Sequence, residues 1–491
     1  MLRVSGLFVL VALASLMIAD VSVTTLDPWT ELQRMALGAI TPDFTAVSDI
    51  GWVLARTVAF AFCGVALGAV GGFILSQLFH IGPVRWICAF IRAIHELFWA
   101  LIFLQMFGLT PLTGVLAIAV PYAGICAKVY AETLEEADLR AAKILAPGTD
   151  MISAFVYARL PTVWVHIKSY TSYRFECGLR SSAVLGFVGL PTLGFQLESA
   201  FSEGNYSEAA ALMILFYILI ASLRYWMRAR LVGLYALAAP FLLGSGFSIQ
   251  MSNIVRFFGV DIVPAPLRDH DIFTLAAWSN FADWIWMMLS DMALPGVVAT
   301  VVLTQIALVG TGVLALLMYP MISEKFFGSV GRSIGHGILV IVRSTPEFIL
   351  AYVLLHLWGP SMLPAIVALS LHNGAIIGHL IGRFSNEIAL RPDHPTGINL
   401  YAYEILPRVY GQFLAFLFYR WEVIMRETAI LGILGIATLG FFIDSALSEI
   451  RLDRAMFLIA VTATLNIGID ILSRRIRAGL HLSDTARQLN K

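Results

Sequence analysis

One block of sequence occurs twice in this chain. The first copy runs from Tyr173-Arg174-Phe175-Glu176 to Gly194-Phe195, and the second runs from Tyr419-Arg420-Trp421-Glu422 to Gly440-Phe441. Equivalent residues are separated by 420 − 174 = 246 positions, and the match holds without a gap over charged, small and apolar residues. A match of this kind is the signature of an internal repeat. The sequence therefore predicts a tandem duplication.

The composition places both copies in a lipid bilayer. Hydrophobic residues make up 59% of the chain and charged residues 13%, and the mean hydropathy is +0.83. These values are typical of a polytopic membrane protein. The formal net charge is zero, so no basic field favours nucleic acid as a partner. Two copies of one membrane unit suggest a pseudo-symmetric pore between them.

Windows of about twenty apolar residues predict an all-α protein with six membrane spans in each half, about twelve in all. The first six lie near residues 4–25, 53–79, 86–107, 112–131, 161–178 and 208–223. The second six lie near residues 231–249, 294–320, 335–357, 363–381, 408–424 and 455–473. A glycine-rich apolar stretch, 183–195 or 429–441, separates the last two spans of each half and is predicted to re-enter the membrane.

The duplication predicts two units, 1–230 and 231–491, with cores at about 50–230 and 290–480. Arg3 before an apolar run is also compatible with a cleaved signal peptide. A retained first helix fits the duplication better, because the second half also opens with an extra apolar span. Arginine-rich loops are kept in the cytoplasm and predict that both termini are cytoplasmic.

The chain lacks the usual signatures of enzymes and of metal sites. The cysteines lie singly in apolar runs and are interpreted as packing residues: Cys63, Cys88, Cys126 and Cys177. No Gly-Lys dipeptide occurs, so the chain has no Walker A loop for ATP, and no Gly-x-Ser-x-Gly elbow sits on a strand. His95-Glu96 has no second histidine one helical turn later. We therefore expect no catalytic residue, metal or cofactor.

Each half carries one long polar loop, 132–161 or 383–407, that closes with Leu-Pro. These charged, alanine-containing loops are predicted to form surface helices that dock a peripheral partner. A solvated connector is the alternative. The loops resemble the EAA loop of bacterial ABC importer permeases, and the repeated Tyr-Arg-aromatic-Glu block resembles the phosphonate-type, PhnE-like branch of the binding-protein-dependent importers.

This resemblance implies two fused type I (MetI-like) permease units in the bacterial plasma (inner) membrane. It implies a permease subunit for a phosphonate-like oxyanion, with a cytoplasmic ABC ATPase dimer and an extracytoplasmic substrate-binding protein as partners. His394 stands where such loops usually carry glycine, so the two loops are unlike. The residues that the resemblance assigns to ATPase coupling are Glu136, Arg140, Gly148, Glu387, Arg391 and His394.

Ionisable groups inside the membrane are the candidate pathway residues, because each costs about 2.5–3.5 kcal/mol at mid-bilayer. They are Arg174, Glu176 and Arg180 in the first copy and Arg420, Glu422 and Arg426 in the second, expected near the outer end of the fifth core helix. One interpretation pairs the glutamates with the arginines four residues later. In the other, Arg174 and Arg420 face each other and bind an oxyanion.

Two further features recur. Arg92 and Glu96 return as Arg343 and Glu347, separated by 343 − 92 = 251 positions, either as helix anchors or as a cytoplasmic gate or ATPase contact. The glycines of the block serve either close packing or a periplasmic gate. The predicted gate residues are Leu185, Gly186, Gly189, Leu431, Gly432 and Gly435.

A secondary transporter with duplicated six-helix halves is the alternative function. It would need an acidic proton or sodium site within its spans, and it would not need docking loops.

Overall fold

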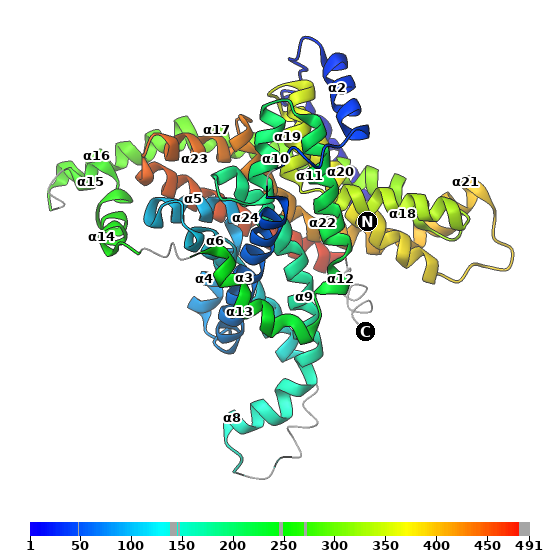
Figure 1. Cartoon of the computed structure of the whole chain (residues 1–491), viewed down its shortest axis with the longest axis horizontal. Coiled ribbons are helices and arrows are strands. Elements are labelled where there is room, and N and C mark those ends of the chain that lie inside the picture. The colour runs from blue at the N-terminus through cyan, green and yellow to red at the C-terminus, as the bar shows by residue number, and fades with distance from the viewer. Residues whose placement is uncertain (48, 138–144, 146–147, 245–248, 270–272, 481–491) are drawn as a thin grey trace. The chain divides into compact units, whose positions relative to one another are not determined.

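The computed structural model describes residues 1–47, 49–137, 145, 148–244, 249–269 and 273–480 (Figure 1). The described residues form α-, π- and 3₁₀-helices and no β-strand, which confirms the predicted all-α polytopic class. The chain divides into two compact units. Unit 1 comprises Met1–Ala36 and Phe258–Lys491, and unit 2 comprises Leu37–Phe257.

The helices of unit 2 follow each other in chain order. They are α3 (Ile50–Gln77), α4 (Gly82–Ala93), α5 (Glu96–Phe107), α6 (Pro111–Glu135), α8 (Met151–Ser153), η1 (Ala154–Arg159), α9 (Leu160–Val184), η2 (Leu185–Val188), α10 (Leu193–Ser202), α11 (Tyr206–Ala221), α12 (Leu223–Trp226), η3 (Ala229–Leu231), α13 (Val232–Leu243) and α14 (Met251–Arg256). Two elements lie across the divisions between the units, α2 (Pro28–Ile40) and η4 (Phe257–Asp261).

Unit 1 begins with the first helix of the chain and continues after η4. Its helices are α1 (Leu2–Leu16), α15 (Ala265–Arg268), α16 (Leu275–Met287), η5 (Met288–Ala293), α17 (Leu294–Met318), η6 (Tyr319–Ile322), α18 (Ser329–Ser344), α19 (Glu347–Trp358), α20 (Met362–Glu387), α21 (Gly397–Asn399), η7 (Leu400–Ile405), α22 (Leu406–Ile430), η8 (Leu431–Leu434), α23 (Leu439–Ser448) and α24 (Leu452–Gly479).

Every predicted span contains an apolar helix, but these helices differ in length. Among the described residues, five helices are long and apolar enough to cross a membrane, and the number rises to nine if each of four bent helix pairs is one span. The remaining three predicted spans correspond to the shorter apolar helices α1, α11 and α13. The structure therefore supports a multi-pass membrane protein, with fewer full-length spans than the predicted twelve.

The predicted spans 86–107 and 335–357 each contain a sharp bend. The axis turns by 95° between α4 and α5 and by 91° between α18 and α19. In unit 1 the residue before Pro346 is extended, because the proline ring disfavours a helical conformation there. In unit 2 the same corner is made by His95, whose ring caps α5 by accepting the Leu97 amide at 3.2 Å.

A glycine-lined contact brings two parallel helices close together in each unit. In unit 2 the glycines lie on α3 and face α6; in unit 1 they lie on α20 and face α17 and the η6 turn that follows it. A Cβ atom added at any of them would lie 2.3–3.2 Å from the facing side chain. Glycine permits this approach of the two helices. The contacting pairs are Gly64–Ile118, Gly68–Tyr122, Gly72–Cys126, Gly374–Leu314, Gly378–Met318 and Gly382–Ile322.

The repeated block folds the same way in both units. After α9 the chain makes a 3₁₀ turn, passes through Gly189 in a left-handed conformation (φ +89°) and enters α10 at a bend of 51°. After α22 it makes the same turn, passes through Gly435 (φ +84°) and enters α23 at a bend of 46°. Bent helix pairs of this kind are compatible with the predicted re-entrant stretches, since their polar backbone groups are bonded within the turn.

A threonine from the first long helix of each unit holds this turn in place. The Thr57 hydroxyl accepts the amide of Leu193 at 2.8 Å, and the Thr300 hydroxyl accepts the amide of Leu439 at 3.0 Å. Each amide belongs to the first residue of a helix, where no intrahelical acceptor exists. The duplication therefore extends from the repeated block to the helix that supports it.

The first helix of each half packs in the unit formed mainly by the other half. In unit 1, Phe8 of α1 makes edge-on ring contacts with Phe418 and Trp421, both at 5.1 Å. In unit 2, Tyr235 of α13 meets Phe62 of α3 at 5.9 Å. The compact units therefore differ from the predicted domains 1–230 and 231–491 by the exchange of residues 1–36 and 231–257. The ancestral boundary at 230 stays a prediction.

Candidate functional site

A chain of hydrogen bonds crosses unit 1 from α22 to α20 and back. Arg420 donates Nε–H to Oδ1 of Asn373 at 2.8 Å, and Asn373 donates Nδ2–H to Oε2 of Glu427 at 3.0 Å. Because arginine only donates and a carboxylate only accepts, these partners fix the orientation of the Asn373 amide. Asn373 is fully buried and Glu427 nearly so. The contact links a cation to a buried carboxylate through one amide.

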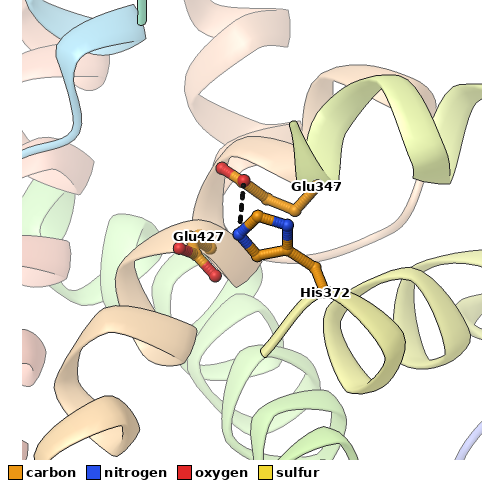
Figure 2. Close-up of side chains that lie close together, drawn as sticks. All are labelled: Glu347, His372 and Glu427. Carbon is orange, nitrogen blue, oxygen red and sulfur yellow. Dashed lines mark ion pairs between the residues drawn. The ribbon is translucent and has the colours of Figure 1, made fainter. Parts of the chain in front are cut away.

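Three side chains from three helices converge beside this amide. Glu347 of α19, His372 of α20 and Glu427 of α22 place one ligand atom each within 4.8 Å of the other two (Figure 2). Nε2 of His372 lies 3.6 Å from Oε2 of Glu347, and Nδ1 lies 2.9 Å from the carbonyl oxygen of Thr345. His372 is 1% exposed and Glu427 6%. Unit 1 thus concentrates two carboxylates and an imidazole in its interior.

Unit 2 uses aromatic rings where unit 1 uses an amide. Arg174 of α9 donates Nε–H to the Tyr170 hydroxyl at 2.8 Å. Its guanidinium carbon lies 5.0–5.9 Å from the centres of the Tyr170, Tyr173 and Tyr122 rings. Tyr122 occupies the position equivalent to Asn373, 251 residues earlier. The repeated arginine therefore reaches the same point of the neighbouring helix in both units, by a cation–π contact in one and a hydrogen bond in the other.

The acidic group of unit 2 is Glu96, the counterpart of Glu347. Nε2 of His95 lies 3.1 Å from Oε2 of Glu96, and the Ser181 hydroxyl lies 3.5 Å from Oε1. Ser181 stands where unit 1 has Glu427. The carboxylate in each unit therefore has a histidine beside it, but the histidine comes from a different position.

Histidine and proline have exchanged places between the two units. His95 is equivalent to Pro346, and Pro121 is equivalent to His372, each pair at the offset of 251. Each unit thus keeps one proline and one histidine at these two positions.

Three relatives of this chain are transport permeases. The phosphate-import permease protein PhnE of Mycolicibacterium smegmatis is 26% identical over 490 residues, which cover 91% of this chain and 88% of that protein. The phosphite transport system permease protein PtxC of Stutzerimonas stutzeri is 28% identical over 227 residues, 43% of this chain and 81% of PtxC. The cryptic phosphonate transport system permease protein PhnE2 of Escherichia coli K12 is 30% identical over 109 residues, 22% of this chain and 89% of PhnE2.

The chain belongs to the phosphonate-type permease family. No protein-family model matches it, and no solved structure matches it with significance. The alignment with the mycobacterial protein covers 91% of this permease and 88% of that protein. The alignment with PtxC covers 81% of PtxC but only 43% of this permease. This difference supports a fusion of two permease units. The relatives are transport proteins and not enzymes, which confirms the prediction that this chain is a permease.

Three of the six predicted pathway residues lie in unit 2 and three in unit 1. Arg174 lies past the midpoint of α9. Within the described ranges no ion pair joins Glu176 and Arg180, and Arg180 donates to Sγ of Cys177 at 3.5 Å. Glu422 and Arg426 are half-buried on α22. Arg174 and Arg420 each donate Nε–H to a side chain, Tyr170 in unit 2 and Asn373 in unit 1.

The predicted gate residues lie in the repeated turn. Leu185 and Leu431 are buried, 1% and 0% exposed. A Cβ atom on Gly186 would lie 2.0 Å from the Phe195 nitrogen, and one on Gly432 would lie 2.1 Å from the Phe441 nitrogen. Gly189 and Gly435 supply the left-handed residue of each turn. The close packing of the turn accounts for these glycines, and a gating role stays a prediction.

The second polar loop of the permease differs from the predicted surface helix, and most of the Ala-rich segment of the first lies outside the described residues. Arg140 lies outside the described residues, whereas Glu136 and Gly148 are exposed. Residues 388–396 are not helical, because Pro392 and Pro395 remove amide donors and disfavour helix in the residues before them. A helical segment begins only at Gly397 and continues into α22. Glu387, Arg391 and His394 are exposed on this loop.

The buried carboxylate of Glu404, which was not predicted from the sequence, anchors the second loop. Glu404 is 1% exposed and accepts Nη2 of Arg391 at 2.7 Å and Nη2 of Arg408 at 2.6 Å. Burial raises the pKa of the Glu404 carboxyl, but hydrogen bonds and charge from Arg391, with charge from Arg408, outweigh burial and hold the pKa below its ordinary value. Arg408 also donates to the Ala389 carbonyl at 2.8 Å. The sequence signal was a glutamate four residues before an arginine.

Proposed function

We propose that this permease imports a phosphorus oxyanion across the plasma (inner) membrane of a bacterium, with both termini in the cytoplasm. It works with a cytoplasmic ATPase dimer and an extracytoplasmic substrate-binding protein, as the names of its relatives' transport systems suggest in general terms. Those relatives are named for phosphate, phosphite and phosphonate, which share a tetrahedral phosphorus centre with negatively charged oxygens. A pathway for such cargo needs positive groups that release it again.

The observation that carries the proposal is the repeated arginine. Arg174 and Arg420 are at equivalent positions in the two units, and each is anchored through Nε to a neighbouring polar side chain. This anchoring orients the planar guanidinium, whose Nη1 and Nη2 groups form a second donor edge. That edge matches two oxygens of a tetrahedral oxyanion. We infer that the two arginines bind cargo in succession or together as it passes.

The polar loops supply the coupling in this proposal. ATP-driven closure of the ATPase dimer pushes the exposed loop segments that contain Glu136 and Gly148 in one half and Glu387, Arg391 and His394 in the other. The helical lead-in of the second loop is continuous with α22, which carries Arg420. Motion of that loop is therefore transmitted along one helix to the proposed cargo site. The Arg391–Glu404–Arg408 cluster stiffens this connection.

One observation favours the secondary transporter instead. Glu347 and Glu427 are acidic groups within the membrane part of unit 1, which is the feature that a proton- or sodium-driven carrier would need. The two functions differ in their energy source. Uptake that stops when ATP is depleted and persists when the proton gradient is collapsed supports the importer, and the reverse result supports the secondary transporter.

The test of the cargo pathway is uptake of radiolabelled phosphate, phosphite and methylphosphonate by cells that express the complete transport system. Arg174→Ala and Arg420→Ala each remove a charge-assisted donor worth about 1.5–3 kcal/mol, so we expect uptake to fall about tenfold or more. Arg475→Ala, at an exposed position of α24, is the matched control. Full uptake by both variants, with normal amounts of protein in the membrane, would refute the proposal.

A further inference from the structure

We propose that Glu347, His372 and Glu427 bind a divalent metal ion of the zinc type inside unit 1. The three side chains come from α19, α20 and α22 and point toward one another (Figure 2). One imidazole nitrogen and carboxylate oxygens are ligands that zinc accepts in proteins, and three protein ligands leave the fourth tetrahedral position for water or another oxygen ligand. The assignment rests on these side chains and does not depend on the identity of the cargo.

The protonation pattern of His372 directs a lone pair toward the carboxylates. Nδ1 lies 2.9 Å from the Thr345 carbonyl oxygen, which can only accept, so Nδ1 carries the proton. In the neutral ring Nε2 is then a bare acceptor, and it faces Oε2 of Glu347 at 3.6 Å. A proton on Nε2 would make this contact an ion pair, and a metal ion in the same place would be bound by both groups.

The histidine of unit 2 shows the opposite pattern. Nδ1 of His95 lies 3.2 Å from the Leu97 amide, which can only donate, so Nδ1 is the acceptor. Nε2 then carries the proton and donates it to Glu96 at 3.1 Å. This pair satisfies itself without a metal. Because Ser181 also replaces Glu427 there, the proposed site is confined to unit 1.

The spacing of the atoms in unit 1 is closer to that of metal ligands than to that of a hydrogen bond. An N–H···O hydrogen bond spans about 2.7–3.2 Å, shorter than the 3.6 Å between His372 and Glu347. Two ligands of one tetrahedral zinc ion, with bonds of about 2.0–2.1 Å, lie about 3.3–3.5 Å apart. All three ligand atoms fall within 4.8 Å of one another, so a small shift of side chains closes the site.

The groups around the three ligands hold them in the orientation that a metal requires. The Thr345 carbonyl holds the outer nitrogen of His372, and Asn373 donates to Glu427. Such outer hydrogen bonds fix the tautomer of a ligating histidine and the rotation of a ligating carboxylate. Arg420 in turn fixes Asn373. The metal and the proposed oxyanion-binding arginine are thus linked through one side chain, and the ion offsets two buried negative charges that would otherwise repel an anion.

The test is metal binding by the full-length chain purified in detergent, stripped with a chelator and titrated with ZnCl₂ in a calorimeter. We expect one tight site per chain, and at least tenfold weaker binding in His372→Gln and in Glu427→Gln. The matched control is His95→Gln, which makes the same substitution beside Glu96 and leaves the wild-type affinity unchanged. No zinc uptake by the wild type, or equal affinity in all variants, would overturn the proposal.

A second measurement separates loss of the site from loss of the fold. Co²⁺ bound at four-coordinate sites absorbs visible light strongly, so Co²⁺ titration reports coordination directly. Glu427→Asp keeps a carboxylate and should retain the band with a shifted position. Glu427→Gln should lose it while eluting as the same detergent-solubilised species. A band that survives in Glu427→Gln would exclude that residue as a ligand and defeat the three-ligand assignment.

Discussion

Nε of Arg420 donates a 2.8 Å hydrogen bond to Oδ1 of Asn373, and this bond decides that the Asn373 amide offers its NH₂ group to Glu427. We predict that Asn373→Leu, which keeps the volume and removes both hydrogen bonds, lowers the free energy of unfolding by about 1–3 kcal/mol. The reason is that a buried carboxylate and a guanidinium each lose a partner. The apparent melting temperature in detergent measures the effect.

Thr464→Leu is the control for that variant. Thr464 is exposed on α24, and its hydroxyl bonds to Ala460 within the same helix. We expect its melting temperature to stay close to that of the wild type. If Asn373→Leu had the same melting temperature as Thr464→Leu, the hydrogen-bond chain would not contribute to the stability of unit 1.

The turn of the repeated block should not tolerate a methyl group. In Gly186→Ala and Gly432→Ala the new Cβ meets backbone nitrogen at 2.0 and 2.1 Å, so the backbone must shift. We expect a loss of about 1–3 kcal/mol or more in each case, seen as less folded protein in the membrane. Gly468→Ala, in an open position on α24, should be neutral or stabilising by up to about 1 kcal/mol. Equal yields for all three would contradict the geometry.

The threonines that hold the turn can be tested in parallel. Thr57→Val and Thr300→Val keep the shape and remove the acceptor for the amides of Leu193 and Leu439. Leaving a buried amide without its acceptor costs about 1–3 kcal/mol, so both variants should melt earlier and by similar amounts. Thr133→Val, whose hydroxyl donates to Val129 within α6, is the control. An effect in one unit alone would show that the two turns are not equivalent.

The Glu404 cluster predicts a pH dependence of the second loop. Because the folded-state pKa of Glu404 is below the ordinary value of 4.5, its contribution to loop order is complete above that value and is lost as the pH falls through the folded pKa. At neutral pH, Glu404→Gln should have the same effect as protonation of the Glu404 carboxylate, because both remove its negative charge. We expect amide hydrogen exchange in residues 388–396 to accelerate several-fold in this variant. Glu387→Gln, an exposed position on the same loop, should leave the exchange unchanged.

Much of the fold could be predicted from the repeated block. The 246-residue offset located both fifth helices and both glycine turns, because a gapless match carries helix, turn and support together. The corners before Glu96 and Glu347 were missed, since an apolar window reads two short helices as one span. The sequence signal was Pro346 in the middle of the window. The exchange of α1 and α13 left no local signal, because it depends only on contacts between distant segments.

The candidate site was predicted only in part. Arg174 and Arg420 stood out because they recur, but Glu347, His372 and Glu427 lie 25 and 55 residues apart on three helices, so no motif joins them. His372-Asn373 within an apolar span was the available signal, since polar residues inside the membrane need partners. A position-by-position comparison of the two halves would have found the site, because His372 aligns with Pro121 and Glu427 aligns with Ser181.

The packing of α1 in unit 1 also sets an order for synthesis. Synthesis through Phe257 supplies all the residues of unit 2. The ring partners of Phe8, which are Phe418 and Trp421, are made later. Helix α1 is therefore made 418 − 8 = 410 residues before its ring partner Phe418. Unit 1, to which α1 belongs, is therefore the unit completed second.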